Sequence, residues 1–127
     1  MNGLKTLLVD DSPEFLEVAA DFLSRHSLVE VVGTARSGRQ ALALADELSP
    51  DLVLMDFSMP EMNGLEAIRS LKVRAFPPQV IMITLHSSEE LSSLAKAAGA
   101  DGFVVKSDFA DSLLPLIAKL FPAVEVT

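Results

Sequence analysis

Short apolar runs alternate along the chain with segments in which apolar residues recur at helical spacing. The runs are rich in Val, Ile and Leu and lack strict alternation, which is typical of strands buried on both faces of a parallel sheet. Five strands are therefore expected, at Thr6–Val9, Val29–Ala35, Leu52–Met55, Val80–Thr84 and Gly102–Val105.

The segments between these strands predict five helices. In the first, apolar residues from Phe15 to Leu23 occupy positions i, i+3, i+4, i+7 and i+8, which form one face of a helix. Similar apolar stripes predict four more helices, over residues 41–48, 65–71, 91–98 and up to about 120.

Polar residues mark where several of these helices begin. Ser12 is followed by proline, which places an N-cap hydroxyl directly before a favoured first-turn residue. The pairs Ser37–Gln40 and Ser87–Glu90 have the spacing of a capping box, in which each residue satisfies a backbone N–H near the other. We therefore expect the second and fourth helices to start beside these pairs.

Pro115 conflicts with the fifth helical pattern, because proline in a helix interior removes a hydrogen bond. Either this helix begins near Ser112, which puts Pro115 in its first turn, or it is kinked at the proline. The sequence leaves both options open.

Five strand–helix units in one uninterrupted series predict the α/β class, as a single doubly wound (βα)5 three-layer sandwich with right-handed crossovers. The 127 residues suit one domain with a substantial core. We expect this domain to cover residues 1–122, with residues 123–127 as a C-terminal tail or the start of a linker.

Composition narrows the function classes. Half of the residues are apolar, which excludes wholesale disorder, and the uncharged apolar stretches are too short for a membrane span. The chain has no Cys and shows no secretory signal, so a cytoplasmic protein without disulfides or thiolate metal sites is expected. Ten basic residues against 18 acidic ones give a net charge of −8, which argues against direct binding of nucleic acid.

Polar residues stand directly after four of the five predicted strands. Asp10 and Asp11 follow the first strand, Asp56 follows the third, Thr84 ends the fourth and Lys106 follows the fifth. Ligands of open parallel sheets bind outside the carboxyl ends of the strands, so these side chains are expected to meet in one crevice.

Three carboxylates in one crevice repel one another, by roughly 4 kcal/mol per pair at 4 Å and an effective dielectric of 20. Lys106 offsets one negative charge and leaves two, which a divalent cation would balance. Because the available ligands are oxygens, Mg²⁺ fits best, with Mn²⁺ as a substitute. Asp56 stands alone on the central strand and is the best candidate for a nucleophile that forms an aspartyl-phosphate.

Each of these residues also has an ordinary structural explanation. Asp10 and Asp11 could cap a helix, Asp56 could be a loop acid, and Lys106 could be a surface lysine. The phosphoryl site is favoured because complementary groups occupy four separate strand ends together.

Several segments carry a family resemblance. They are Leu-Leu-Val-Asp-Asp-Ser at residues 7–12, Asp-Leu-Val-Leu-Met-Asp at 51–56, Met-Pro-Glu-Met-Asn-Gly at 59–64, Thr84, Ala-Gly-Ala-Asp-Gly-Phe at 98–103, and Lys106. On these residues the chain resembles the receiver domain of two-component response regulators, over residues 4–121. The resemblance implies a flavodoxin-like fold with parallel sheet order 2-1-3-4-5.

The resemblance also implies a chemistry for the site. A histidine kinase or histidine phosphotransfer protein would donate a phosphoryl group to Asp56. Mg²⁺ would be held by Asp11, Asp56 and the backbone carbonyl of Ser58, with Asp10 acting largely through water. Thr84 and Lys106 would bind the phosphoryl oxygens.

A switch is implied as well. Thr84 would move towards the phosphoryl group and Phe103 would turn inward, which would remodel the surface formed by the fourth helix, the fifth strand and the fifth helix. Phe103 has no hydroxyl, so a plain core position suits it equally well. A phosphorylation-dependent homodimer through the fourth and fifth helices is consistent with the resemblance.

Some positions depart from the family pattern. Leu85 follows Thr84 where a small residue is usual, and its bulk is expected to narrow access to Asp56. Ser58 and His86 occupy positions that tune hydrolysis of the aspartyl-phosphate in the family, although His86 is also typical of a solvent-facing loop residue. Ser107 replaces a usual proline after Lys106, which makes the placement of that lysine less secure.

The leading hypothesis is a phosphorylatable receiver with an unknown output domain or downstream protein. An adaptor whose pocket is blocked by Leu85 is the second. A phosphohydrolase is third, because that chemistry usually places two acids two residues apart, whereas Asp10 and Asp11 are adjacent. A flavin carrier is weakest, since acids stand where a phosphate loop would be needed.

Overall fold

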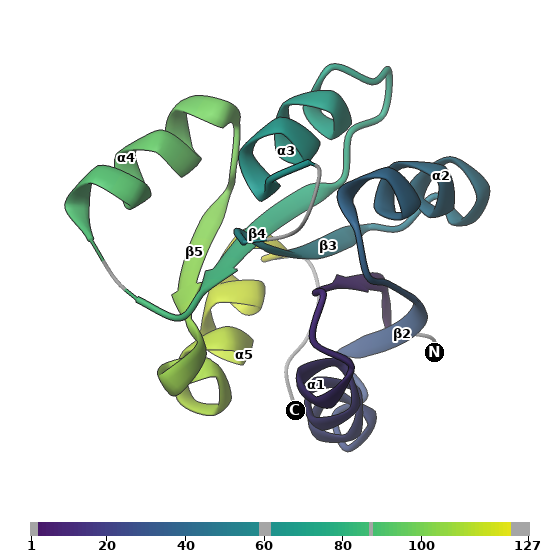
Figure 1. Cartoon of the computed structure of the whole chain (residues 1–127). Helices are drawn as coiled ribbons and strands as arrows, with labels where there is room; N and C mark the ends of the chain where they lie inside the picture. The colour runs from purple at the N-terminus through teal and green to yellow at the C-terminus, as the bar shows by residue number, and fades with distance from the viewer. Residues whose placement is uncertain (1–2, 59–61, 87, 123–127) are drawn as a thin grey trace.

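The computed structural model describes residues 3–58, 62–86 and 88–122. Its centre is a five-stranded parallel sheet in the order β2-β1-β3-β4-β5, which confirms the expected topology (Figure 1). The strands are β1 (Leu4–Val9), β2 (Val29–Ala35), β3 (Leu52–Asp56), β4 (Gln79–Thr84) and β5 (Gly102–Val105).

Helices cover both faces of this sheet, as the sandwich prediction required (Figure 1). They are α1 (Pro13–Ser24), α2 (Gly38–Leu48), α3 (Gly64–Lys72), α4 (Glu89–Ala98) and α5 (Phe109–Leu120), with a short 3-10 turn, η1 (Lys106–Asp108), before the last. None of the helices in the described residues is long and apolar enough to span a membrane.

The sheet separates two apolar cores. Leu7 and Val9 of β1 point into the core beneath α2, α3 and α4, whereas Leu8 points into the core beneath α1 and α5. Every residue of the central strand β3 is buried, which explains why the four residues before Asp56 are all apolar. The sheet and its register therefore hold the carboxyl end of β3, at Asp56, in a fixed position.

Two of the predicted helix starts are confirmed in detail. The Ser12 hydroxyl accepts the Phe15 N–H at 3.2 Å, and the Ser37 hydroxyl accepts the Gln40 N–H at 3.1 Å. The return bond of the capping box differs, because the Gln40 side chain accepts the N–H of Arg36 at 2.8 Å. Both helices thus begin with satisfied backbone donors.

The predicted cap of α4 is off by one residue. Ser88 is the N-cap and accepts the Leu91 N–H at 3.0 Å, whereas Ser87 lies outside the described residues. Ser87 and Ser88 stand next to each other in the sequence. Each is followed three residues later by a residue whose backbone N–H could donate to the serine hydroxyl, so the sequence does not distinguish them. Only the backbone path into the helix distinguishes them.

Helix α5 begins at Phe109, so a start near Ser112 is wrong and Pro115 lies inside the helix. The Phe109 side chain is buried and packs edge-on against Phe15 and Phe22 of α1, which anchors the first turn ahead of the proline. Because Pro115 has no N–H, the carbonyl of Asp111 cannot receive its usual helical hydrogen bond.

Gly64 brings the start of α3 against the end of β3. Its N–H donates to the Phe57 carbonyl at 2.9 Å, and a Cβ at this position would lie 2.5 Å from the Asp56 carbonyl oxygen. Real Cβ atoms do not approach backbone so closely, so only glycine fits here. The glycine that closes the 59–64 segment is therefore explained, while residues 59–61 themselves lie outside the described residues.

Gly64→Ala is expected to destabilise the domain by about 1–3 kcal/mol, because the new methyl group meets rigid backbone. Gly33→Ala is the control, since its Cβ would meet side-chain methyl groups, of Leu48 at 2.8 Å and of Leu7 at 3.5 Å, and not backbone. Urea unfolding monitored by circular dichroism measures both variants. Equal stability losses would show that the approach at Gly64 is not restrictive.

Candidate functional site

The carboxyl ends of the strands bring the predicted polar residues together. Asp10 follows β1, Asp56 ends β3 and Thr84 ends β4, and all three are buried. Asp11 is exposed, yet one carboxylate oxygen each from Asp10, Asp11 and Asp56 lie within 4.8 Å of one another. The three acids thus form one cluster at the edge of the sheet.

Lys106, at the end of β5, reaches into this cluster. Its ammonium lies 2.7 Å from Asp10 Oδ2 and 3.8 Å from Asp56 Oδ1, and its side chain is only 15% exposed. The substitution of Ser107 for proline therefore does not remove the lysine from the site. The first turn after the strand is η1, and the described residues contain no cis peptide bond.

The oxygens of Asp10 have different partners. Oδ1 accepts the N–H of Ser12 at 2.8 Å, which fixes the carboxylate at the start of α1. Oδ2 is buried, and its contact with the Lys106 ammonium is an ion pair without hydrogen-bond alignment. This oxygen can therefore accept a further partner, such as a water molecule on a metal ion.

The pKa of Asp56 is raised from its ordinary value of 3.8 to about 7. Burial is the largest cause, and the charge of Asp10 is the next. Lys106 and a backbone hydrogen bond from Ser58 act in the opposite direction but do not cancel these effects. The ionised form of Asp56 is therefore disfavoured until a further cation, such as a metal ion, binds beside it.

The donor set fits a magnesium ion. The cluster offers carboxylate oxygens, without sulfur ligands, and holds three acids against one lysine. Hard oxygen ligands with excess negative charge are what Mg²⁺ prefers. The three acids therefore form a suitable site for Mg²⁺.

A hollow of about 810 Å³ opens onto the acids, and Asp56, Thr84 and Lys106 all line it. Ser58, Leu85 and His86 also line it, and their side chains are exposed. Leu85 is 66% exposed, so much of its bulk faces solvent. Leu85 therefore lines the hollow without closing it to solvent, and whether it narrows access to Asp56 stays a prediction.

Phe103 lies apart from this hollow. It is half-buried on β5 and packs against the core beneath α2, α3 and α4, where its backbone pairs with Met82. Its surroundings are those of a core residue with one side open beside α4. The site residues and Phe103 are thus joined through β5 and not by direct contact.

The sequence predicts Phe15 only as part of the apolar face of a helix, and not as a residue of the site. Its ring lies 4.4 Å from the Lys106 ammonium, and it lines the hollow together with Asp56. An aromatic residue four positions after Asp11 would be the sequence signal. Its meaning depends on where the end of β5 lies in space.

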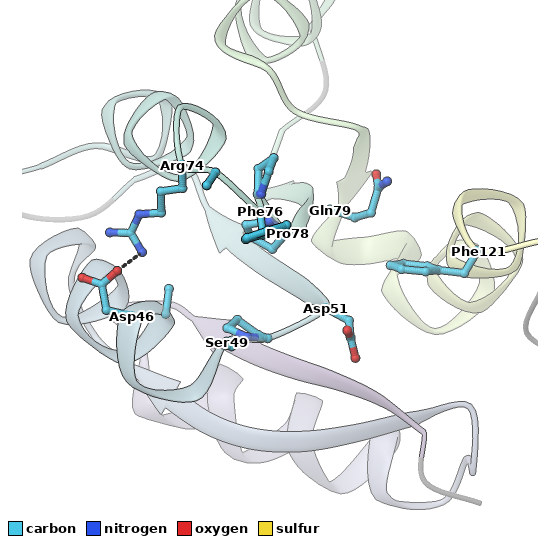
Figure 2. Close-up of a pocket in the computed structure, with 12 residues that line it drawn as sticks. Asp46, Ser49, Asp51, Arg74, Phe76, Pro78, Gln79 and Phe121 are labelled. Atoms are coloured by element: carbon cyan, nitrogen blue, oxygen red, sulfur yellow. Dashed lines mark ion pairs between the residues drawn. The ribbon is translucent and has the colours of Figure 1, made fainter.

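A second hollow, of about 590 Å³, lies at the opposite edge of the sheet, where β3 and β4 begin (Figure 2). Its charged groups are already engaged. Asp46 pairs with Arg74 at 2.7 Å, and Asp51 accepts the Lys5 N–H at 2.8 Å. This hollow therefore takes no part in the chemistry of the acid cluster.

Comparison with known proteins identifies the family. The model of the "Response regulator receiver domain" matches residues 6–118. The receiver domain of a putative NarL response regulator from Mycobacterium tuberculosis superposes with a TM-score of 0.83 at 31% identity, over 97% of this chain and 96% of that one. The chain thus belongs to the receiver domains of two-component response regulators.

Curated relatives agree with this assignment. A protein-glutamate methylesterase/protein-glutamine glutaminase of Geobacillus kaustophilus is 43% identical over 108 residues, covering 84% of this chain and 31% of the relative. The nitrate/nitrite response regulator NarL of Escherichia coli is 35% identical over 108 residues, covering 85% of this chain and 50% of the relative. The chain therefore spans between a third and a half of these proteins.

This membership decides between the main hypotheses for the domain. It is a receiver domain, whose acidic pocket and lysine at the strand ends fit a phospho-accepting response regulator, and receivers do not turn over a separate substrate. The phosphohydrolase and flavin-carrier hypotheses are thereby set aside.

Asp56→Asn is expected to stabilise the metal-free domain at pH 8, by on the order of 2 kcal/mol. The folded pKa lies above the unfolded one, so ionisation of Asp56 costs stability as pH rises from about 4 to about 7, and the full cost remains above 7. Asparagine carries no such cost. The advantage should therefore vanish near pH 4.

Urea unfolding in EDTA at pH 4, 6 and 8 measures this difference. Glu30→Gln is the control, because it also removes one negative charge but from an exposed position on β2. A pH-independent effect of Asp56→Asn would contradict the raised pKa.

Proposed function

We propose that Asp56 is the phosphoryl acceptor and that the donor is a phosphohistidine of a histidine kinase or histidine phosphotransfer protein. The observation that supports this most strongly is the position of Asp56. It is the acid at the end of the buried central strand, it faces the open hollow, and the Lys106 ammonium lies 3.8 Å away. Asp10, by contrast, is held by Ser12 and Lys106.

The transfer exchanges one bond for another. A carboxylate oxygen of Asp56 forms a bond to phosphorus while the P–N bond to the donor imidazole breaks, and the imidazole that leaves takes up a proton. With acetyl phosphate, a P–O bond breaks instead and acetate leaves. The anionic form of Asp56 is required, so a cation that lowers its raised pKa favours the reaction.

Mg²⁺, or Mn²⁺ in its place, would supply charge neutralisation for the phosphoryl oxygens. We assign Asp11, Asp56 and the backbone carbonyl of Ser58 to hold it directly, and Asp10 to act largely through water. This division matches their positions. Asp11 is exposed and lines the hollow, whereas Oδ2 of Asp10 is buried and paired with the Lys106 ammonium.

Thr84 and Lys106 would bind phosphoryl oxygens. Thr84 ends β4 beside the acids, and Lys106 needs to move only a short way from Asp10 to reach a group on Asp56. Such a movement would pull on the ends of β4 and β5. We propose that Thr84 and Phe103 transmit it to the surface formed by α4, β5 and α5.

The partners follow from the family and not from this chain alone. The relatives carry further sequence beyond the matched region, so an output domain or a downstream protein would read the α4-β5-α5 surface. A phosphorylation-dependent homodimer on this surface is a further proposal. We place the domain in the cytoplasm, with no direct contact to nucleic acid or membrane.

Labelling with acetyl phosphate tests the acceptor. Wild-type protein in Mg²⁺ should gain one phosphoryl group per chain by mass spectrometry, and Asp56→Asn should reduce the initial rate by more than about 100-fold, because it removes the nucleophile. Asp51→Asn, at the opposite end of β3, is the matched control and should label normally.

Stoichiometric labelling of Asp56→Asn would refute the assignment of the nucleophile. Absence of both labelling and any spectroscopic response to beryllofluoride in the wild type would instead support the adaptor hypothesis.

Leu85→Ala is expected to speed labelling by small phosphodonors. The increase should be less than about tenfold, which corresponds to about 1.4 kcal/mol, because Leu85 already faces solvent for the most part. Stopped-flow kinetics with acetyl phosphate measures the change. His86→Ala and Ser58→Ala serve as companions, because we propose that these two residues affect the lifetime of the aspartyl-phosphate. An unchanged or slower rate for Leu85→Ala would show that Leu85 does not narrow access.

A further inference from the structure

Lys106 has neighbours on three sides. Asp10 Oδ2 lies 2.7 Å from its ammonium, Asp56 Oδ1 lies at 3.8 Å, and the centre of the Phe15 ring lies at 4.4 Å. The face of an aromatic ring is negative and attracts a cation, most strongly where water is excluded. At 15% exposure, the lysine side chain is in such a place.

The Phe15 ring is itself held in place by other rings. It packs edge-on against Phe109 of α5, with centroids 5.4 Å apart, and Phe109 packs against Phe22 of α1 at 5.6 Å. Since two helices contribute to this cluster, the orientation of the Phe15 face is set by the packing of α1 on α5. The ring therefore offers Lys106 a fixed surface.

We propose that Phe15 is a positioning residue for phosphoryl transfer, which keeps the Lys106 ammonium between Asp10 and Asp56. Asp10 is the nearer acid and, acting alone, would draw the lysine away from the acceptor. The ring adds attraction from a third side without a hydrogen-bond acceptor that would hold the lysine fast. Lys106 then remains free to turn towards a phosphoryl oxygen.

The residue after the lysine is consistent with such support. Ser107 leaves the backbone after Lys106 free of the restriction that a proline would impose. A side-chain contact across the hollow compensates for this freedom. The inference rests on the proposed role of Asp56 as acceptor, and it adds a residue on α1 to the groups that act there.

Removal of the ring tests the proposal. Phe15→Leu should lower the initial rate of labelling by acetyl phosphate in saturating Mg²⁺ by about 3- to 30-fold. This fold-change corresponds to the strength of cation–π contacts from exposed to desolvated sites. Phe15→Tyr keeps an aromatic face and should stay within about twofold of wild type. Phe121→Leu is the matched control, because it removes a half-buried ring that packs against the same core but lies at the opposite end of the sheet, and it should label at the wild-type rate.

Rings whose faces are less negative separate electrostatic attraction from packing. Incorporation of mono-, di- and trifluorophenylalanine at position 15 should slow labelling progressively while the free energy of unfolding changes little, since fluorine withdraws charge from the face. Equal rates across this series would overturn the proposal. The series also answers the question if Phe15→Leu fails to fold.

A double-mutant cycle shows whether Phe15 acts through the lysine. In a Lys106→Met background, Phe15→Leu should cause no further loss of labelling. An undiminished loss in that background would mean that Phe15 acts by packing alone, and would overturn the proposal. Failure of the wild type to label at Asp56 would instead contradict the proposed function, so the two failures are distinguishable.

Discussion

The mutual repulsion of three carboxylates is the constraint on which the rest of this structure depends. Two of them, Asp10 and Asp56, are buried, where charge is costly, and among the residues that the structure describes Lys106 is the cation that pairs with both. As a result, the pKa of Asp56 is raised to about 7, and Oδ2 of Asp10 is buried without a donor aligned for a hydrogen bond. The charges of this cluster are therefore unbalanced without a divalent cation, and in the function proposed above metal binding and phosphorylation change that balance.

The surrounding fold keeps the acids together against that repulsion. The parallel register of a fully buried β3 fixes Asp56, while the N–H of Ser12 holds Asp10 at the start of α1. Gly64 allows α3 to close over the end of β3, where any side chain would collide with backbone. Packing free energy from the two cores, far from the charges, therefore stabilises an arrangement that electrostatics alone would open.

The two ends of the sheet divide the work. At the carboxyl ends of the strands, the acids outnumber the positive charges that pair with them. At the other end of the sheet, Asp46 pairs with Arg74 (Figure 2), and Asp51 accepts the Lys5 N–H. The chemistry of phosphoryl acceptance is therefore confined to one edge. The curated relatives are about two to three times as long as the region that matches this chain.

The sequence by itself determined the strands, the alternation with helices and the acids that end those strands, because burial on both faces and polar residues after apolar runs are local patterns. The sheet order came from family resemblance and agrees with the structure. The tertiary structure alone decided that Ser88 caps α4, that α5 begins at Phe109 ahead of Pro115, and that Phe15 faces Lys106. The Ser88 cap depends on the backbone path into α4, which the two neighbouring serines do not reveal. The start of α5 and the place of Phe15 depend on contacts between residues distant in the chain, and no periodicity along one segment records which partner a distant segment will bring.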